Sequence, residues 1–206
     1  MIGVVEFGLG NIGSILNMFK FLGMPCKLVS QPSEMADCTK LLLPGVGHFD
    51  RGMIELRKRG LDEALDRAVN EDGVPILGIC LGMQLLMEGS DEGTEPGLGW
   101  IKGRARRFPS DLRDGDQKLK VPHMGWSNVE PAANSKMFKD WEGECRFYFV
   151  HSYHVEPTDP NTVAGASHYG TDFTSAIEQG NVMGAQFHPE KSHKMGMRLL
   201  RNVYGK

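Results

Sequence analysis

The first half of the chain alternates short apolar runs with amphipathic segments. The apolar runs at residues 2–7, 26–29, 40–44 and 74–79 have the length and apolar character of buried strands. Between them, apolar residues recur at helical spacing, as in Ile12, Ile15, Leu16, Phe19 and Leu22, and residues 61–69 and 81–88 are also helix-like. Strands that alternate with helices predict a mainly parallel sheet with helices on both faces.

This pattern changes after Glu88. An exposed loop at residues 90–99 precedes a series of short β-like runs, with Asp114-Gly115 as a predicted hairpin turn between the first two. These runs are residues 104–108, 119–122, 146–155, 162–167, 175–178 and 183–188. We expect an antiparallel section that extends or folds over the sheet, and a closing helix from about residue 193 to 204. The prediction is an α/β fold in one domain, residues 1–206.

A sharp strand-to-helix turn is predicted at Cys80, within Gly78-Ile79-Cys80-Leu81-Gly82. Such a turn needs small neighbours because the chain packs closely on both sides, and it lifts the side chain to the carboxyl edge of the sheet. Free N–H groups and the positive end of the next helix lie at that edge and favour a thiolate. Cys80 is therefore a candidate nucleophile. This motif alone leaves open that it is a small core residue.

Charge and cysteine usage exclude several classes of function. The net charge is −3 with acidic and basic residues mixed, which gives no electrostatic basis for binding nucleic acid or a membrane surface. No apolar run is long enough to span a bilayer, and the start of the chain has the pattern of a strand and not of a signal peptide. The four cysteines are scattered, without a C-x-x-C pair. We therefore expect a cytoplasmic protein with neither a disulfide framework nor a metal site.

A cysteine nucleophile needs a base, and the base needs an orienting group. His188 ends an apparent strand and is followed by Glu190, and residues i and i+2 of an extended chain point to the same side. His151 is the rival base, or else a structural or substrate-facing histidine. A strand-terminating turn is the alternative for His188-Pro189-Glu190. The remaining histidines are expected in turns or at the surface: His48, His123, His154, His168 and His193.

The segment Gly8-Leu9-Gly10-Asn11-Ile12-Gly13 matches the G-x-G-x-x-G fingerprint of dinucleotide sites. That fingerprint also needs an acidic residue at the end of the second strand, about 20 residues on, to bind the ribose. The second strand ends in Ser30-Gln31-Pro32, and Glu34 already belongs to the next turn. A dinucleotide site is therefore disfavoured.

Two further features are expected at the sheet edge that carries Cys80. Gln84 follows one helical turn later and could hydrogen-bond a polar substrate, or be an ordinary exposed glutamine. The turn Pro44-Gly45-Val46-Gly47 offers backbone N–H groups that could form an oxyanion hole together with that of Leu81. A plain Gly-rich turn is the alternative for this second feature.

Together these residues resemble the triad-type glutamine amidotransferases and, more narrowly, the glutaminase subunits of imidazole glycerol phosphate synthase. The resemblance covers nearly the whole chain. The cysteine and His-Pro-Glu motifs mark the broad class, and Pro-Gly-Val-Gly-His-Phe, His-Met-Gly-Trp and Tyr-Phe-Val-His-Ser-Tyr mark the subunit. The segments that carry it are residues 7–11, 43–49, 77–86, 122–126, 147–153 and 186–192.

The resemblance implies a reaction and a role for each site residue. It implies that Cys80 attacks the side-chain amide of glutamine, that His188 transfers protons and that Glu190 orients His188. The oxyanion would be held by the N–H groups of Leu81 and, after a backbone reorientation, Val46. Glutamine would be held by Gly47, Gln84 and the backbone of Ser152 and Tyr153. The products would be glutamate and ammonia, and no metal or organic cofactor is expected.

The resemblance also implies a partner. Ammonia would pass into a (β/α)8-barrel cyclase subunit of the HisF type, which forms imidazole glycerol phosphate and AICAR in histidine biosynthesis. Asn11, Trp126 and Lys191 are expected at the surface that meets this partner in a heterodimer. Glutaminase activity is expected to be weak until the cyclase is docked and loaded with its nucleotide substrate.

The chain departs from the usual pattern of this subunit in three places. Ser127 interrupts the usual Gly-Trp-Asn, Glu6-Phe7 stands where Asp-Tyr is common, and His154 follows Tyr153. These departures lie outside the triad, in segments expected near the partner. Three alternatives stay open: a paralogous subunit that supplies ammonia for amidination of a cell-surface sugar, a stand-alone cysteine hydrolase, and a non-catalytic binding module.

Overall fold

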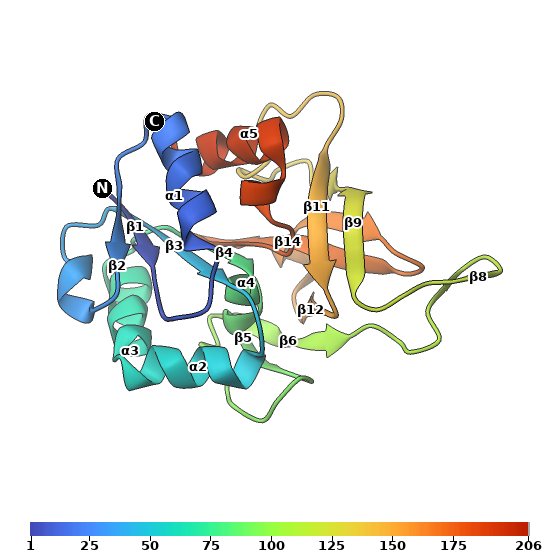
Figure 1. The fold of residues 1–206 in the computed structure, drawn as a ribbon, viewed down its shortest axis with the longest axis horizontal. Coiled ribbons are helices and arrows are strands. Elements are labelled where there is room, and N and C mark those ends of the chain that lie inside the picture. Colours follow the sequence, from blue (N-terminus) through green and yellow to red (C-terminus); the bar gives the residue numbers. More distant parts are fainter. Residues whose placement is uncertain (206) are drawn as a thin grey trace.

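A parallel sheet in the order β2-β1-β3-β4-β15 forms the centre of the molecule (Figure 1). The computed structural model describes residues 1–205. Each of these strands runs parallel to its neighbours within this group. Their bounds are Ile2–Val5 (β1), Cys26–Val29 (β2), Lys40–Gly45 (β3), Ile76–Cys80 (β4) and Val182–Ala185 (β15).

Helices cover both faces of this sheet, as the alternating pattern predicts. On β3, Leu42 belongs to the core with helices α1 and α5, whereas Leu41 and Leu43 belong to the core with α2, α3 and α4. This separation follows from the period of two in a strand. The helices are Ile12–Phe21 (α1), Phe49–Lys58 (α2), Leu61–Asp66 (α3), Leu81–Leu85 (α4) and His193–Tyr204 (α5), and Arg67–Glu71 continues α3 as a π-turn.

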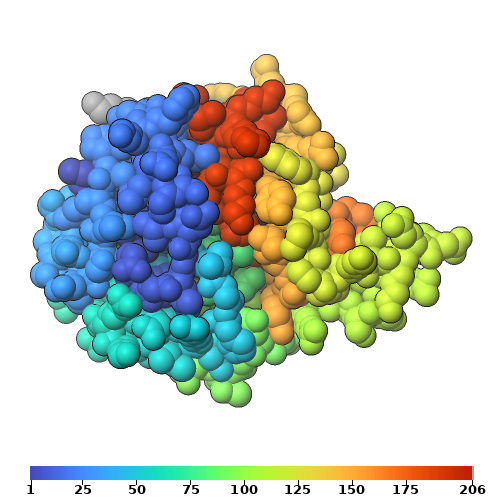
Figure 2. Space-filling view, viewed as in Figure 1, coloured from blue at the N-terminus to red at the C-terminus, as the bar shows by residue number. Residues whose placement is uncertain are grey.

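The predicted antiparallel section extends the same sheet. Strand β14 pairs antiparallel with β15 and leads on to β12, β6 and β5, while β13 pairs with β14 and β10 pairs with β13. The pair β9 and β11 forms a separate sheet, and β7 and β8 form an arm that extends from the body (Figure 2). The bounds are Met87–Ser90 (β5), Ile101–Arg107 (β6), Arg113–Asp114 (β7), Gln117–Lys118 (β8), His123–Asn128 (β9), Glu130–Pro131 (β10), Arg146–His151 (β11), Tyr153–Pro157 (β12), Val163–His168 (β13) and Asp172–Gln179 (β14).

Several predicted bounds are wrong. The helix after Cys80 ends at Leu85, because Met87–Ser90 pairs with β6 instead of continuing the helix. The expected run 119–122 is not a strand: the Leu119 N–H donates to the Leu112 carbonyl, and the Lys120 carbonyl accepts from the Tyr169 hydroxyl. The expected run 146–155 is two strands, which separate at Ser152. The sequence pattern does not predict strand β9.

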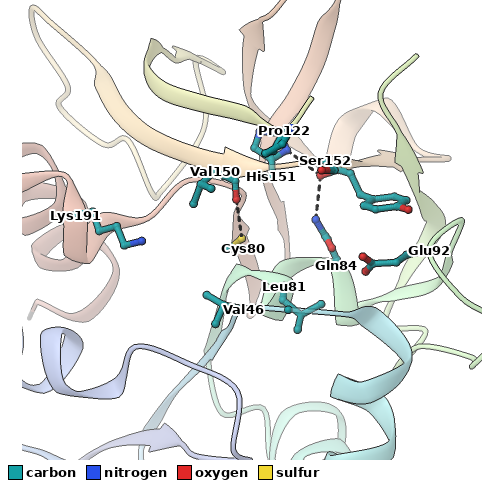
Figure 3. A pocket seen from close by; sticks show the side chains of 12 residues that line it. Val46, Cys80, Leu81, Gln84, Glu92, Pro122, Val150, His151, Ser152 and Lys191 are labelled. Atoms are coloured by element: carbon teal, nitrogen blue, oxygen red, sulfur yellow. Dashed lines mark hydrogen bonds between the residues drawn. The ribbon is translucent and has the colours of Figure 1, made fainter. Parts of the chain in front are cut away.

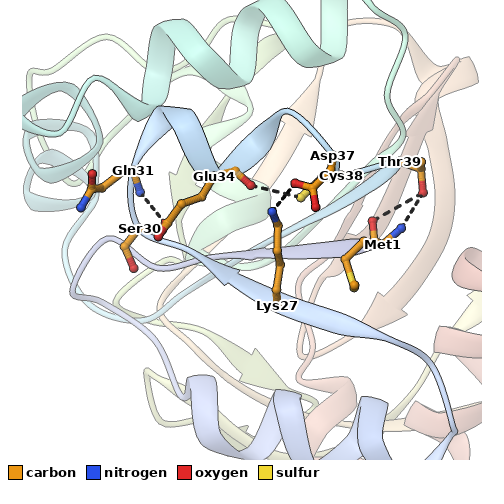
Figure 4. Close-up of polar contacts among 8 residues, drawn as sticks. All are labelled: Met1, Lys27, Ser30, Gln31, Glu34, Asp37, Cys38 and Thr39. Atoms are coloured by element: carbon orange, nitrogen blue, oxygen red, sulfur yellow. Dashed lines mark hydrogen bonds and ion pairs between the residues drawn. The ribbon is translucent and has the colours of Figure 1, made fainter.

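Side-chain contacts fix the connection between β2 and β3 (Figure 4). The Glu34 carboxylate accepts hydrogen bonds from the N–H groups of Ser30, at 2.7 Å, and Gln31, at 3.1 Å. Lys27 forms an ion pair with Asp37 across the same loop. Glu34 therefore caps a 3-10 turn. This agrees with the prediction that Glu34 belongs to the turn after the second strand.

Within residues 1–205, the four cysteines are all free. No helix of this part of the chain has both the length and the apolar character that a bilayer crossing requires. The same residues contain no group of three histidine, cysteine, aspartate or glutamate side chains placed to hold a metal ion.

Two glycines make the turn at Cys80 possible. A Cβ atom on Gly82 would lie 1.8 Å from the Leu43 carbonyl oxygen, and one on Gly78 would lie 2.7 Å from the Gly82 carbonyl oxygen. Neither position has room for a side chain, because the backbone of α4 packs directly on β3 and β4. This close approach holds the start of α4 at the carboxyl edge of the sheet.

We expect Gly82→Ala to lower the free energy of unfolding by about 2–3 kcal/mol, because the new methyl group must displace β3 or α4. The measurement is urea denaturation followed by circular dichroism. Gly13→Ala is the matched control, since a Cβ there meets nothing within 4 Å and α1 should gain up to about 1 kcal/mol. Equal stabilities of the two variants would contradict the packing argument.

Candidate active site

Cys80 ends β4 with φ 53° and ψ −108°, and α4 begins at the next residue. A positive φ in a residue with a Cβ is strained, and it turns the side chain away from the sheet axis toward the helix. The thiol lies 3.9 Å from the Val150 carbonyl oxygen and 3.7 Å from the side-chain amide nitrogen of Gln186. Cys80 is only 7% exposed, so it has few contacts with solvent.

His188 and Glu190 form a buried pair, with 2.7 Å between Nδ1 and Oε1 and with side chains 1% and 3% exposed. The sequence predicts that an extended strand places these two side chains on the same side. The structure forms the pair in a different way. Strand β15 ends at Ala185, and Glu190 lies in a 3-10 turn, Pro189–Lys191. The turn is held in place because the Ser192 hydroxyl donates to the His188 carbonyl.

The surroundings of His188 make it a strong base. Burial alone would lower the pKa of this imidazole, but Cys80 and Glu190 together outweigh burial and raise it to about 10. The Nε2 atom is buried and has no hydrogen-bond partner among residues 1–205. At neutral pH the ring is therefore protonated, with one N–H directed to Glu190 and the other available for a group near Cys80.

A cavity of about 450 Å³ opens beside Cys80 (Figure 3). Its walls bring together segments that are far apart in the sequence. The sequence-predicted residues that line it are Val46, Gly47, Cys80, Leu81, Gln84, Ser152, Tyr153 and Lys191. His188 and Glu190 are not part of the lining. The cavity therefore presents the thiol and two backbone turns to a small ligand, whereas the base, His188, lies outside the lining.

Gln84 is buried, so its interpretation as an ordinary exposed glutamine is wrong. Its amide nitrogen lies 3.0 Å from the Tyr153 carbonyl oxygen and 3.2 Å from Oε1 of Gln186. These two contacts occupy both N–H groups, which leaves Oε1 as the polar atom that Gln84 can offer to a ligand. The Ser152 carbonyl oxygen already accepts from the Phe108 N–H.

Two polar residues near the thiol are not predicted from the sequence: Glu92 in the cavity lining and Gln186 outside it. Glu92 lines the cavity near Gln84 (Figure 3), and its carboxylate also accepts from the Phe49 N–H at 2.8 Å. It lies in an acidic, Gly-containing loop, where nothing local distinguishes it from its neighbours. Gln186 is fully buried and contacts both Cys80 and Gln84. Its position two residues before His188 is the only feature of the sequence that points to it.

The expectation that His123 and His154 lie at the surface is wrong. They are 2% and 7% exposed. His123 stacks on Phe149 and Tyr169, with ring centroids 5.0 Å and 4.0 Å apart. The error arose because the pairing of β9 with β11, which places His123 opposite His151, was not predicted.

His151 differs from His188 in its neighbours. Its Nδ1 lies 2.8 Å from the Tyr153 carbonyl oxygen, and no carboxylate holds it. Burial lowers the pKa of His151 to about 3 and that of His123 to about 4. Both rings are therefore neutral at pH 7, and His151 is a much weaker base than His188.

Of the three residues expected at a partner surface, Lys191 alone belongs to the cavity lining. Lys191 lines the cavity, and its ammonium group lies 5.7 Å from the ring centroid of Tyr148. Trp126 is 38% exposed, and its ring centroid lies 6.2 Å from that of the same tyrosine. Asn11 is exposed directly before α1. The structure thus brings Trp126 and Lys191 together around Tyr148.

A model of class-I glutamine amidotransferases matches residues 3–206, and the chain belongs to this family. Within it, relatives that match along almost their full length place the chain with the HisH-type glutaminase subunits. It is 46% identical to "Imidazole glycerol phosphate synthase subunit HisH" of Bdellovibrio bacteriovorus, over 98% of both chains. It is also 46% identical, over 98% of both chains, to "Imidazole glycerol phosphate synthase subunit HisH 2" of Pseudomonas aeruginosa.

Solved structures agree on the fold. A glutamine amidotransferase crystal structure matches with a TM-score of 0.75 over 98% of both chains at 18% identity. The structure of PurLQS from Thermotoga maritima matches with a TM-score of 0.75 over 98% of this chain and 96% of that chain, at 19% identity. The predicted α/β fold with its mainly parallel sheet and antiparallel section is therefore confirmed.

The two neutral buried histidines predict acid sensitivity. Their folded pKa values of about 4 and about 3 lie below the ordinary value of 6.5, so below pH 6.5 the unfolded chain binds more protons than the folded chain. As the pH falls from 6 to 4.5, each should reduce the free energy of unfolding by roughly 1.0–1.3 kcal/mol per pH unit. Urea denaturation at several pH values measures this slope.

The histidine contribution to this slope should fall by less than half in His123→Asn, because burial also lowers the pKa of a third histidine, His154. His168→Asn is the control, because the pKa of this exposed histidine is raised by Asp172, so it adds no slope below pH 6. An unchanged slope in His123→Asn would show that His123 is already protonated in the folded protein.

Proposed function

We propose that this glutamine amidotransferase hydrolyses L-glutamine to glutamate and ammonia through a Cys80 thioester. It then passes the ammonia to a HisF-type (β/α)8-barrel cyclase in a cytoplasmic heterodimer of histidine biosynthesis. The observation that carries the proposal is the buried His188–Glu190 pair behind a cysteine that is held on a strained turn at a cavity. This combination matches the logic of a nucleophile, a base and an orienting group. The whole chain, residues 1–206, would act as one glutaminase domain.

The chemistry follows from the charges in the site. With His188 protonated, Cys80 attacks the carbonyl carbon of the glutamine side chain as a thiolate, and a C–S bond forms. His188 then donates its Nε2 proton to the departing nitrogen, and ammonia leaves as the C–N bond breaks. The now neutral His188 takes a proton from water, which cleaves the thioester and releases glutamate. Glu190 stabilises the imidazolium form at the start and end of this cycle.

Substrate groups can be assigned by chemistry. The developing oxyanion would accept from the Leu81 N–H at the start of α4 and from the Val46 N–H after this backbone turns toward it. The glutamine ammonium group needs acceptors, which Oε1 of Gln84 and the Glu92 carboxylate can supply. The substrate carboxylate needs donors, which would come from backbone N–H groups near Gly47 and Ser152. No step in this scheme requires a metal or an organic cofactor.

The proposed partner surface lies where ammonia would leave. Lys191 lines the cavity, and Trp126 lies nearby across Tyr148, so a barrel docked over these residues would cover the cavity mouth. The family names support this partner, because the full-length relatives are subunits of imidazole glycerol phosphate synthase. Asn11, exposed before α1, would complete the contact.

A second candidate is a paralogous subunit that supplies ammonia for amidination of a cell-surface sugar. Two relatives, from Pseudomonas aeruginosa and Methanococcus maripaludis, carry the name HisH 2, and a numbered name points to more than one such subunit in an organism. The glutaminase chemistry would be unchanged, and only the partner would differ. A stand-alone cysteine hydrolase on this fold would show full activity without any partner.

Cys80→Ala should abolish glutamine hydrolysis, because no other group can form the thioester, while ammonia-dependent synthesis by the cyclase continues. Glu190→Gln should lower kcat by a smaller factor, because it only misorients the base. Glutamate release in the presence of the cyclase measures both. Cys26→Ser, a half-buried thiol away from the cavity, should retain wild-type rates. Residual turnover in Cys80→Ala would contradict the assignment of the nucleophile.

Glutamate release should also rise strongly when the histidine-pathway cyclase and its nucleotide ligand are added to the chain. The physical reason is that partner docking would turn the Val46 N–H toward the oxyanion. If Cys80 still reacts with a glutamine analogue but this cyclase produces no stimulation, the sugar-amidination partner becomes the better choice. High activity of the chain alone would favour the stand-alone hydrolase.

A further inference from the structure

A chain of buried hydrogen bonds runs from strand β9 to the active-site cavity. The Ser127 hydroxyl lies 2.9 Å from Nε2 of His123, whose Nδ1 lies 3.2 Å from Nε2 of His151. Nδ1 of His151 then lies 2.8 Å from the Tyr153 carbonyl oxygen, which also accepts from Gln84 at 3.0 Å. The same Gln84 amide contacts Gln186, which donates to the Cys80 thiol at 3.7 Å.

One carbonyl fixes the direction of every bond in this chain. The Tyr153 carbonyl can only accept, so Nδ1 of His151 must carry a proton. In a neutral ring Nε2 of His151 is then an acceptor, and Nδ1 of His123 must be the donor to it. Nε2 of His123 is in turn an acceptor, so the Ser127 hydroxyl donates. Both rings are neutral at pH 7 because burial lowers their pKa values to about 3 and about 4.

We propose that Ser127, His123 and His151 form a positioning relay that fixes the Tyr153 carbonyl and, through it, the orientation of Gln84 beside Cys80. Ser127 and His123 lie outside the cavity lining, and His151, which lines the cavity, holds the Tyr153 carbonyl through Nδ1. With both lone pairs of the Tyr153 carbonyl occupied, the Gln84 amide nitrogen is held against it and Oε1 is left for the substrate. A reversed Gln84 amide would place an oxygen against the carbonyl oxygen, which is repulsive.

The Ser127 hydroxyl anchors the outer end of the relay. Without it, Nε2 of His123 would be an acceptor that has lost its donor, and the ring would lose one of the two hydrogen bonds that hold it against His151. Ser127 follows Trp126 on β9, so the relay starts on the strand that carries a proposed partner residue and ends at the substrate cavity.

The direct test is the protonation state of the two rings. Long-range ¹H–¹⁵N spectra of the full chain labelled with ¹⁵N-histidine distinguish the two neutral tautomers from imidazolium. We expect His123 and His151 both to be neutral with the proton on Nδ1 at pH 7, in the wild-type protein and in Ser127→Ala, because the Tyr153 carbonyl fixes the tautomer. In Ser127→Ala the ¹⁵N shift of Nε2 of His123 should change, because this atom loses its donor. If His151 carries its proton on Nε2 in the wild-type protein, or if the Nε2 shift of His123 does not respond to Ser127→Ala, the relay is wrong.

The functional test compares KM with kcat for glutamine hydrolysis. His123→Leu removes the donor to His151, and about a fivefold rise in KM is expected, with kcat within about twofold, since a single orienting hydrogen bond is lost. His123→Asn places an amide N–H near the position of Nδ1 and should bring KM back to within about twofold of wild type. Ser135→Ala, which removes a hydroxyl that contacts Glu178, is the matched control and should change neither constant.

A merely structural role would give a different result: less folded protein and a lower apparent kcat in both His123 variants, without rescue of KM by asparagine. That outcome would overturn the relay. The comparison of KM with kcat rests on the proposed glutaminase function. Glutamine binding to Cys80→Ala is therefore measured by calorimetry in parallel. Absence of binding there would reject the proposed function. Binding whose Kd is unaltered by His123→Leu would reject the relay alone.

Discussion

The active site depends on the close approach of α4 to strands β3 and β4. Gly78 and Gly82 allow backbone to pack on backbone, and this contact forces Cys80 into a conformation that a residue with a Cβ adopts only under constraint. The strain is maintained because the sheet and the helix on either side are buried and cannot relax separately. As a result, the thiol lies at the edge of the sheet, where the buried core borders the cavity.

Burial has opposite consequences for the histidines because their neighbours differ. His188 has a thiol on one side and a carboxylate on the other, and its pKa rises despite desolvation. His151 and His123 face each other, a carbonyl and a hydroxyl, and desolvation lowers their pKa values. The protein therefore contains one cationic ring suited to proton transfer and two neutral rings suited to fixed hydrogen bonding. Their roles follow from what each ring contacts and not from the residue type.

The antiparallel half of the fold completes a site that the parallel half begins. The thiol, the Pro44–Gly47 turn and His188 follow strands of the parallel sheet, whereas Ser152 and Tyr153 come from the segment where β11 passes into β12. Gln84 joins the two halves by its hydrogen bonds to Tyr153 and Gln186.

The sequence by itself determined the alternation of strands and helices and the turn at Cys80, because these depend on local periodicity and on glycine spacing. It also indicated the pairing of His188 with Glu190, although a 3-10 turn and not extended backbone brings the two side chains together. Only the tertiary structure decided that Met87 starts a strand, that His123 is buried, that Glu92 lines the cavity and that Gln186 contacts Cys80. Each of these depends on a partner far along the chain: β6 for Met87, β11 for His123, Phe49 for Glu92 and Gln84 for Gln186. A local pattern records which side chains prefer burial, but long-range pairing decides what they meet there.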